Sequence, residues 1–365
     1  MRTFYKGLII TGLAVSAAMT QTMEETVSKL GAAAGKAYVA PVVSGFGSNL
    51  NAGWFHKSPP AKKFGLNFEV GPVFMGTLLK GGSKTLNVSG GFRLDSTQAR
   101  NVANEVDTTG MFGQGQALRD SVAAAIRRSD IRVNFAGPTI IGEDGMPMTY
   151  EVAADPITVG TMAGDTTITL PSTVDTLRDG SGAALNFAVL SDFADMPLPL
   201  VAPQITIGTI YGTNLTVRYL PEYDLKDVGT IKFSGFGIQH NPAVWLGSPL
   251  PVDLSVGFFT QSLEVGTLFK ASSQAYGLNV SKTFGWRILN VTPYGGFMFE
   301  NSNFDFKYDL ELDDGEAVPI SFSLEGENKY RATAGLSVRL FLINLNADYN
   351  FAKYNSFSAG VMVGI

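Results

Sequence analysis

Phe357-Ser-Ala-Gly-Val-Met-Val-Gly-Ile365 ends the chain, and its apolar residues alternate with small or flexible ones. Because side chains of a strand point alternately to opposite faces, five apolar residues fall on one face. They are Phe357, Ala359, Val361, Val363 and Ile365. A terminal strand with one apolar face is typical of the strand that closes a membrane β-barrel.

The same two-residue rhythm recurs upstream in runs of about ten residues, the length that a tilted strand needs to cross the hydrocarbon layer. Short links favour a meander over a two-sheet sandwich, and a closed ring leaves no exposed strand edges. The sequence therefore predicts an all-β, antiparallel up-and-down transmembrane β-barrel of about 12 strands, within a range of 10 to 14. The clearest runs lie in 64–70, 86–93, 214–219, 230–234, 252–258, 278–281, 331–340 and 345–351.

Composition agrees with a barrel without excluding a large soluble β-sandwich. Charged residues make up 16% of the chain, against roughly 25% in ordinary soluble domains. The net charge of −5 and the lack of long Lys/Arg runs argue against nucleic-acid binding. The chain has no cysteine, which excludes disulfides and thiolate metal sites.

Residues 1–20 have the build of a secretory signal peptide. Arg2 and Lys6 supply positive charge, and an apolar core from Gly7 to Ala18 is too short to span a bilayer. Cleavage after Ala18 and cleavage after Thr20 both fit the sequence. The alternative is an uncleaved anchor helix, which no stop-transfer stretch supports.

Residues 21–63 are expected to form a helix followed by a plug-like segment. Thr22 and Glu25 fit a capping box, which predicts a helix from Thr22 to about Ala40, with Pro41 as its stop. Three placements remain open for the whole segment: inside the barrel as a plug, beneath its periplasmic mouth, or in front of the first strand as a loosely ordered leader.

Residues 64–365 are assigned to the barrel, with 95–200 as a large insertion. The runs 64–70 and 86–93 are expected to form the first hairpin. The insertion contains a predicted helix from Ala117 to Ser129. It is also expected to contain a hidden barrel strand from Ile131 to Thr139, because the direction of the later strands requires one more crossing of the membrane. Long excursions of such barrels are normally extracellular, so the insertion is expected outside the cell.

A second excursion is predicted where charged residues occupy every second position after Phe304. The chain turns at Asp314-Gly315, which is a hairpin signal, and returns through Phe322. This hairpin is expected to project beyond the membrane. Aromatic residues near strand ends suggest belts at the lipid headgroups, namely Trp245, Trp286, Tyr294, Tyr349 and Tyr354.

The second half of the chain resembles an uncharacterised family of Gram-negative outer-membrane β-barrels over about 197–365. The residues that carry this resemblance are Leu198-Pro-Leu-Val-Ala-Pro203, 207–221, Leu250-Pro-Val-Asp-Leu-Ser-Val-Gly-Phe-Phe259 and Val291-Thr-Pro-Tyr-Gly-Gly296. The resemblance implies an outer-membrane location. It also implies contact with lipid and lipopolysaccharide, and with the barrel-assembly machinery and periplasmic chaperones during maturation.

More distantly, the chain is similar to the long-chain fatty-acid transporters, which combine an N-terminal hatch with a barrel. The Asn-Pro-Ala element of such hatches occurs here only as Asn241-Pro242-Ala243. Its position far from the N-terminal segment argues against a hydrophobic substrate.

Catalytic chemistry is not predicted. The chain has two histidines, His56 and His240, and neither lies in a recognisable motif, so no enzyme, cofactor or metal site is expected. Acidic residues in 311–316 lack the spacing of an EF-hand and are interpreted as a solvated turn.

The remaining functional signal is a set of charged residues on the predicted inner wall. One interpretation is a hydrated lumen that mildly prefers anions, and the other is pairing of opposite charges that fills the interior. Three functions are considered: a porin-like or gated passive transporter of small solutes, a non-conducting scaffold that displays its loops to an external partner, and a transporter of hydrophobic compounds. The candidate lumen residues are Glu69, Arg93, Arg218, Lys232, Asp253, Arg331, Arg339 and Asp348.

Overall fold

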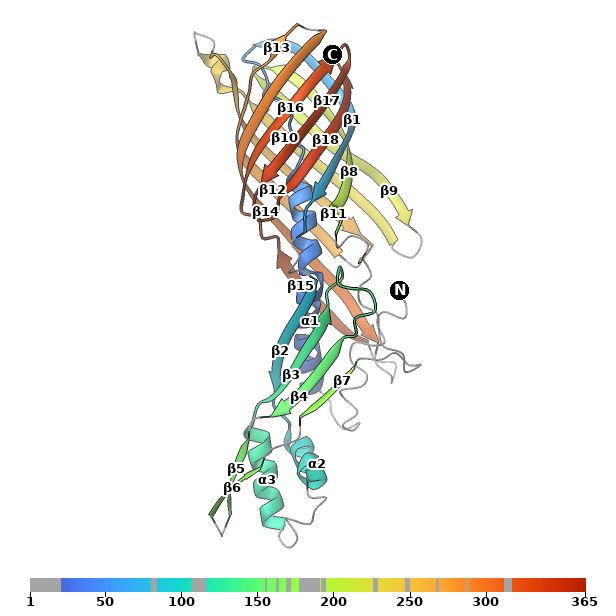
Figure 1. Ribbon diagram of the computed structural model, residues 1–365, viewed down its shortest axis with the longest axis vertical. Helices are drawn as coiled ribbons and strands as arrows, with labels where there is room; N and C mark the ends of the chain where they lie inside the picture. Colours follow the sequence, from blue (N-terminus) through green and yellow to red (C-terminus); the bar gives the residue numbers. More distant parts are fainter. Residues whose placement is uncertain are drawn as a thin grey trace. The chain divides into compact units, whose positions relative to one another are not determined.

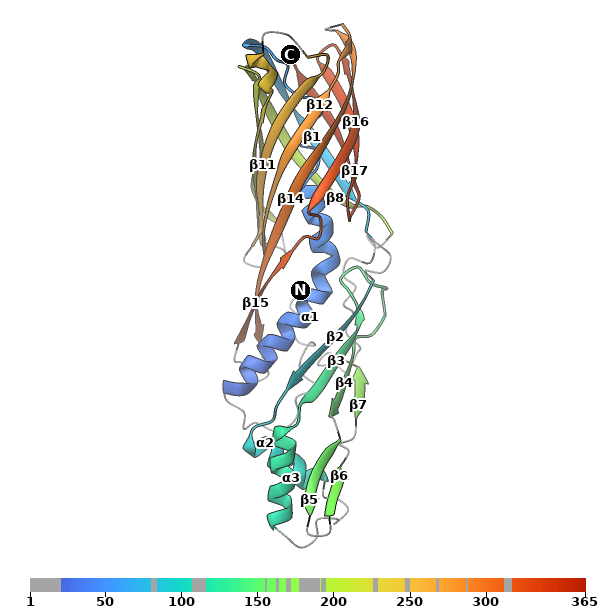
Figure 2. The ribbon, with the colours of Figure 1, turned by 90° about the vertical axis from the view of Figure 1, so that its left-hand side faces the viewer.

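The computed structural model describes most of the chain (Figures 1 and 2). The described residues are 21–79, 84–106, 116–154, 156–161, 164–168, 172–176, 191, 195–225, 229–246, 250–266, 269–286, 288–311 and 317–365. The chain divides into two compact units. The insertion unit comprises Met1–Val39, Ser83–Ser191 and Asp309–Ile320, and the barrel unit comprises Ala40–Gly82, Asp192–Tyr308 and Ser321–Ile365.

In the barrel unit, ten of the described strands form a closed antiparallel ring. Each of these strands pairs with the ring strand that follows it in chain order. The last strand pairs with the first through a register that includes Val70 opposite Val363. This ring confirms the predicted all-β up-and-down barrel, at the lower limit of the predicted strand number. Its strands are β1 (Phe64–Thr77), β8 (Leu198–Ile210), β9 (Thr213–Leu225), β10 (Gly229–His240), β11 (Asp253–Val265), β12 (Phe269–Ser281), β14 (Leu289–Glu311), β16 (Tyr330–Leu340), β17 (Ile343–Phe351) and β18 (Ser356–Gly364).

Three shorter elements lie off this ring. β13 (Phe284–Gly285) and β15 (Ala317–Glu325) both pair with β14, and η4 (Pro242–Trp245) is a short 3-10 helix between β10 and β11. The pairing of β15 with β14 confirms the strands of the expected charged hairpin. Its turn at Asp314-Gly315 lies outside the described residues, as do residues 1–20 and Gly81-Gly82-Ser83, which separate the runs 64–70 and 86–93.

The predicted alternation separates the two faces of the barrel wall. On β18, Phe357, Val361 and Val363 are exposed on the outside, whereas Ser356 and Ser358 are buried on the inside. The other ring strands repeat this arrangement, with apolar residues outward and mostly polar residues inward. The outer face is therefore apolar without a protein layer covering it in the described chain.

The apolar outer band has a definite height. On β14 the outward positions are apolar or small from Leu289 to Phe299, and they become polar at Asn301. Ten residue steps span about 33 Å along a strand and about 25 Å across a membrane at the usual tilt of about 40°. This height matches the hydrocarbon-facing band of outer-membrane barrels.

Exposed aromatic residues lie at both edges of this band. Tyr276, Phe299 and Tyr330 are neighbours across β12, β14 and β16 at one edge. Trp245 and Trp286 are exposed near the other edge. The predictions for Tyr294 and Tyr354 are wrong, because both side chains are buried and hydrogen-bonded within the barrel unit.

The insertion unit contains its own sheet, in the order β2-β3-β4-β7, and a separate β5-β6 pair. One hydrophobic cluster joins the two helices to residues at the start of β3 and after β2, including Val122, Ile126 and Ile131. The described elements are β2 (Thr85–Phe92), α2 (Ser96–Val106), α3 (Gln116–Arg128), β3 (Ile131–Pro138), β4 (Thr149–Ala154), β5 (Ile157–Thr161), β6 (Gly164–Ile168) and β7 (Thr173–Thr176). The helix predicted from Ala117 to Ser129 is confirmed.

Two predicted barrel strands belong to this separate sheet instead. Residues 86–93 do not form a hairpin with 64–70, because both edges of β1 are occupied by β8 and β18. The strand expected from Ile131 to Thr139 exists as β3, but it pairs with β2 and β4 outside the ring. The alternation of apolar and polar residues gave a wrong prediction here, because a strand that packs one face on a protein core shows the same pattern as a lipid-facing strand.

The N-terminal helix α1 (Gln21–Asn51) is longer than predicted and continues through Pro41. A proline inside a helix costs about 3 kcal/mol, so tertiary contacts of the following turns must offset this cost. Among the described residues, no helix has the length and apolar character needed to cross a bilayer.

Candidate functional site

Residues Ser44–Ser58, named here the plug segment, lie inside the barrel ring. A segment that contacts strands all around a closed ring has to lie within it. Figures 1 and 2 both show the last turns of α1 between barrel strands. Its contacts include Asn49 with Thr77 of β1 and Leu198 of β8, Ala52 with Arg218 of β9, Trp54 with Phe259 of β11, Ser58 with Ser281 of β12, and Asn51 with Asn301 of β14 and Arg331 of β16.

The helix ends inside the barrel in a conformation that leaves carbonyl groups free. Gly53 has a φ of 66°, the left-handed conformation that commonly follows the last helical turn. The last carbonyls of a helix lack partners within the helix and carry partial negative charge. The last turn of α1 has no basic residue of its own. Partners for these carbonyls must therefore come from elsewhere.

Two arginines of the barrel wall supply these partners. Arg218 of β9 donates from Nη2 to the Ala52 carbonyl at 2.9 Å, and Arg331 of β16 donates from Nη2 to the Asn51 carbonyl. The indole of Trp54 donates to the Leu50 carbonyl at 3.1 Å. Three successive carbonyls at the helix end are thus capped, two of them by cations from the barrel wall.

Arg218 also connects the plug segment to neighbouring strands. Its Nε donates to Gln204 at 2.9 Å and its Nη1 to Gln261 at 3.3 Å. The guanidinium carbon lies 4.0 Å from the centroid of the Trp54 ring, a cation–π geometry. These contacts account for an arginine that has no exposed surface.

Arg331 has an acidic neighbour on the wall. Its Nη1 lies 3.4 Å from a carboxylate oxygen of Glu300 on β14, and both side chains are buried. Removing one partner of a buried ion pair leaves the other charge uncompensated, at a cost of about 3–5 kcal/mol.

A second charged cluster lies beyond the helix end. Glu69 of β1 is 1% exposed and lies 2.6 Å from Nζ of Lys57 and 3.1 Å from Nε2 of His56. Lys57 also donates to the side chain of Asn67. The wall carboxylate thus binds two basic residues of the plug segment.

An aromatic cluster fills the space between these charged groups. Trp54 and Phe55 of the plug segment pack with Phe259, Tyr294 and Met298 of the wall. Trp54 stacks on Phe259 with ring centroids 5.3 Å apart. This cluster holds the plug segment by apolar burial in addition to the polar contacts.

The wall also contains polar groups that do not bind the plug segment. Asp348 of β17 accepts hydrogen bonds from Tyr294 at 3.0 Å and from Ser358 at 2.6 Å. Four buried polar side chains on β10, β11 and β12 have at least one atom without a protein partner, namely Gln239, Gln261, Ser273 and Asn279. Such atoms are normally satisfied by ordered water.

Of the eight candidate lumen residues, Glu69, Arg218, Arg331 and Asp348 are buried inside the barrel. Asp253 and Arg339 are only half-buried, and Arg339 donates to carbonyls at the barrel mouth, including that of Gly364. Lys232 faces outward, where it pairs with Glu222 at 2.7 Å. It therefore does not line the interior.

The prediction for Arg93 is wrong. This residue belongs to the insertion unit, where it forms an exposed pair with Asp130 at 2.7 Å. The hydrogen bond to Asp130 and the charge of that carboxylate raise the pKa of the Arg93 guanidinium.

Sequence patterns did not indicate Trp54 and Lys57 of the plug segment, or Glu300 of the wall, as interior contact residues. A signal was present in Gly53-Trp-Phe-His-Lys57, which concentrates aromatic and basic side chains within a stretch rich in Gly, Ser and Asn. Glu300 also lies an even number of residues after Tyr294 on β14, so alternation places both side chains on the inner face of that strand.

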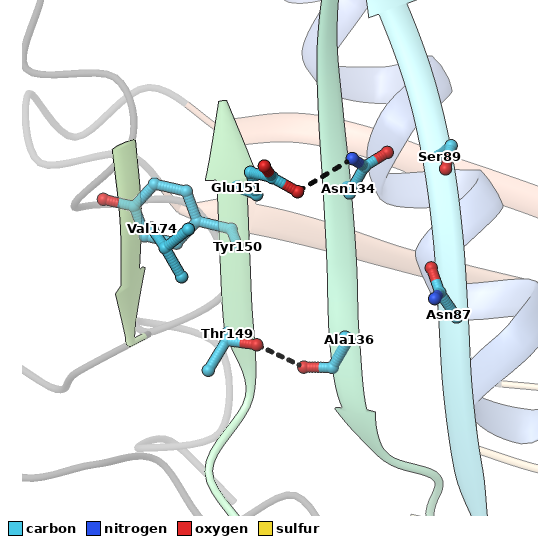
Figure 3. Close-up of a pocket in the computed structure, with 8 residues that line it drawn as sticks. All are labelled: Asn87, Ser89, Asn134, Ala136, Thr149, Tyr150, Glu151 and Val174. Atoms are coloured by element: carbon cyan, nitrogen blue, oxygen red, sulfur yellow. Dashed lines mark hydrogen bonds between the residues drawn. The ribbon is translucent and has the colours of Figure 1, made fainter. Parts of the chain in front are cut away.

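The insertion unit has a separate hollow of about 290 Å³ on its four-stranded sheet (Figure 3). Its polar lining includes Asn87, Asn134 and Glu151, and Asn134 donates to Glu151 at 3.2 Å. Leu86 and Val88 face the opposite side and pack with Met148 and Tyr150. The hollowed face thus combines these polar residues with Ala136 and Val174, whereas the opposite face carries apolar side chains.

Comparisons with solved structures returned outer-membrane proteins at low similarity. A loop-deletion mutant of OmpT, an outer membrane protein of Vibrio cholerae, is 7% identical, with 82% of this chain and 99% of that chain covered and a TM-score of 0.22. The translocation pore of the P pilus usher PapC is 11% identical over 77% of this chain, with a TM-score of 0.18. The match covers about half of the PapC chain, 51%.

Structural similarity at these identities and TM-scores does not support a fold assignment. The fold is therefore assigned from the strand pairing alone. A search of curated proteins found no match. A family model described as "Family of unknown function (DUF6588)" matches residues 1–365. The chain belongs to this family of unknown function.

Proposed function

We propose that the protein is a gated outer-membrane barrel, in which the plug segment blocks passage and small solutes cross when it is displaced. The membrane location is supported by the apolar outer band of about 25 Å and by the exposed aromatic residues at its edges. The partners of the protein would be lipid and lipopolysaccharide, and during maturation also the barrel-assembly machinery and periplasmic chaperones. The proposal includes no catalysis and no cofactor.

The observation that carries the gating proposal is the capping of the α1 carbonyls by Arg218 and Arg331. A hydrogen bond that involves a charged group contributes about 1.5–3 kcal/mol net, because water replaces it when it breaks. Contacts of this kind between plug and wall can therefore be exchanged for water. The buried polar atoms without protein partners on β10 to β12 further support a hydrated interior beside the plug segment.

A reversible disulfide tests whether the plug segment has to move. A Cβ built on Gly45 would lie 3.8 Å from Cβ of Leu198, which is the mean Cβ separation in disulfides. The chain has no other cysteine. In planar bilayers we expect the oxidised Gly45→Cys/Leu198→Cys protein to remain closed and to recover wild-type openings after reduction. The two single-cysteine variants are the matched controls.

Conductance that is the same in the oxidised and reduced double variant would reject the moving plug. A barrel that stays silent in every variant, including one that lacks residues 22–60, would reject transport altogether.

The second candidate function is a non-conducting scaffold that displays the insertion unit to an external partner. The observation that favours it is the polar hollow on a sheet with a separate hydrophobic core (Figure 3). The silent outcome of the conductance experiment would support this function, and openings in the plug deletion would favour transport.

A further inference from the structure

The barrel has two distinct ends, which the strand directions define. At the C-terminal end β1 begins and β18 finishes, and Phe68 and Ile365 exchange backbone hydrogen bonds there. At the insertion end β1 finishes opposite the start of β8, with Thr77 paired to Leu198. The chain therefore leaves the ring for the long insertion at the insertion end.

The upstream part of the plug segment contacts the insertion end. Thr77 donates to the Gly45 carbonyl at 2.9 Å, and Ser44 donates to Glu327, in the link between β15 and β16, at 3.4 Å. Ser48 donates to the carbonyl of Tyr354, in the link between β17 and β18, at 3.3 Å.

The residues that follow the plug segment contact the C-terminal end. Asn241, which follows β10, donates to the Pro59 carbonyl at 2.8 Å. The backbone amide of Tyr211, in the turn after β8, donates to the Lys63 carbonyl at 2.8 Å. Between Ser44 and Lys63 the chain thus runs through the ring from one end to the other.

A second observation, inside the insertion unit, agrees with this direction. Ala37 and Tyr38 of α1 pack against Leu86, Met148 and Tyr150 of the insertion sheet. The helix upstream of the ring is therefore part of the hydrophobic core that the insertion builds. Burial in this core raises the pKa of the Tyr38 phenol.

We infer that the chain is threaded through its own barrel, so that residues 21–39 lie on the insertion side of the membrane and Ile365 lies on the opposite side. The membrane part of this inference rests on the proposed function. In outer-membrane barrels the short turns are periplasmic and the long connections are extracellular. The two-residue turns 211–212 and 341–342 lie at the C-terminal end, whereas the connection 78–197 lies at the insertion end.

The upstream half of α1 is accordingly displayed outside the cell. The plug segment and the core of the insertion unit share one continuous helix, α1.

Threading itself is tested on purified, folded protein with two disulfides, one near each end of the segment. Gly45→Cys/Leu198→Cys reports the insertion end. Ser58→Cys/Ser255→Cys reports the other end, because the hydroxyl oxygens of these serines are 3.0 Å apart. We expect both pairs to crosslink in nearly all folded molecules. Failure of either pair in protein that remains folded on an unheated gel would overturn the threading.

The side is tested in intact cells with a maleimide-polyethylene glycol that is too large to cross porins. Single cysteines replace three exposed residues: Lys36 in α1, Glu143 in the insertion and Lys63 at the C-terminal end. We expect Lys36→Cys and Glu143→Cys to react in intact cells, and Lys63→Cys to react only after the outer membrane is disrupted. The inverse pattern would overturn the outward assignment, and so would reaction of Lys36→Cys together with Lys63→Cys. Protein recovered without detergent would instead reject the membrane proposal, and the two disulfides would still decide the threading.

Discussion

Arg218 and Arg331 come from different strands of the barrel wall, and they donate hydrogen bonds to the adjacent carbonyls of Ala52 and Asn51 at the end of α1. Positive charge at a helix C-terminus stabilises the helix dipole, and burial increases this effect. The wall thus provides the cap that the sequence of α1 lacks. These two residues join the end of α1 to β9 and β16 of the wall.

Replacing Arg331 by Met is expected to release the plug segment more often. The change removes the cap on Asn51 and leaves Glu300 buried without its partner, at a cost of up to about 3–5 kcal/mol. Channel openings in planar bilayers should become more frequent. Arg339→Met is the matched control, because Arg339 lies on the same strand and bonds to Phe341 and Gly364 rather than to the plug. Equal opening rates in the two variants would contradict the role of Arg331.

Replacing Gly235 by Ala is expected to push Trp54 out of its aromatic cluster. A Cβ at this position would lie 2.8 Å from the Trp54 ring and 2.9 Å from Cβ of Gln261. Overpacking of this kind typically costs about 1–3 kcal/mol. Fluorescence of Trp54, measured after the other two tryptophans are replaced by Phe, should shift to the red and become accessible to acrylamide.

Ser234→Ala is the control for this experiment, because Ser234 faces outward on the same strand. If Gly235→Ala leaves the emission of Trp54 unchanged, the packing of the plug segment against β10 is not as described.

Acid is expected to loosen the contact between Ser44 and the loop that carries Glu327. The hydrogen bond from Lys353 is the main cause that holds the pKa of the Glu327 carboxyl below its ordinary 4.5, with further help from Tyr354 and Ser44. A lowered pKa in the folded state means that the stabilisation is complete above about pH 4.5 and is lost as the pH falls through the lower folded value. Trp54 quenching by acrylamide should therefore rise on acidification.

Glu327→Gln should lose this pH dependence over the same range. Glu325→Gln is the control, because Glu325 pairs with Lys329 at the surface. An identical acid response in wild type and Glu327→Gln would assign the transition to another group.

A charge on the outer wall is expected to destabilise the barrel according to its depth. Leu336 is exposed near the middle of the apolar band, and Asn303 is exposed beyond its edge. Arginine at the bilayer midplane costs about 2–4 kcal/mol, and near zero to 1 kcal/mol at the interface. Urea unfolding in lipid vesicles should show this difference between Leu336→Arg and Asn303→Arg. Equal stabilities would argue against a lipid-facing band.

Alternation identified the lipid-facing strands because each of their faces meets one kind of environment. The final strand, with Phe357 and Val361 outward and Ser358 inward, follows this rule, and it was predicted correctly. The same rule predicted wrongly that residues 86–93 form a strand of the barrel. Leu86 and Val88 alternate with Asn87 and Ser89 because they face a protein core, and the pattern does not distinguish a core from lipid.

The interior was predicted less well, because its partners are far apart in the sequence. Arg218 lies inward by alternation, but its contact with Ala52 joins residues that are 166 positions apart. Likewise, Pro41 signalled the end of a helix, and α1 continues to Asn51 because its last turns are held by the surrounding wall.

The amino-acid sequence on its own determined the class of the fold and the orientation of most wall residues, because these depend on local two-residue periodicity and on the contrast between apolar and polar surroundings. Only the tertiary structure decided which strands close the ring, where α1 ends and in which direction the plug segment passes through the barrel. These features depend on hydrogen bonds and charges that meet only after the ring has closed, such as Arg331 with Asn51 and Glu69 with Lys57.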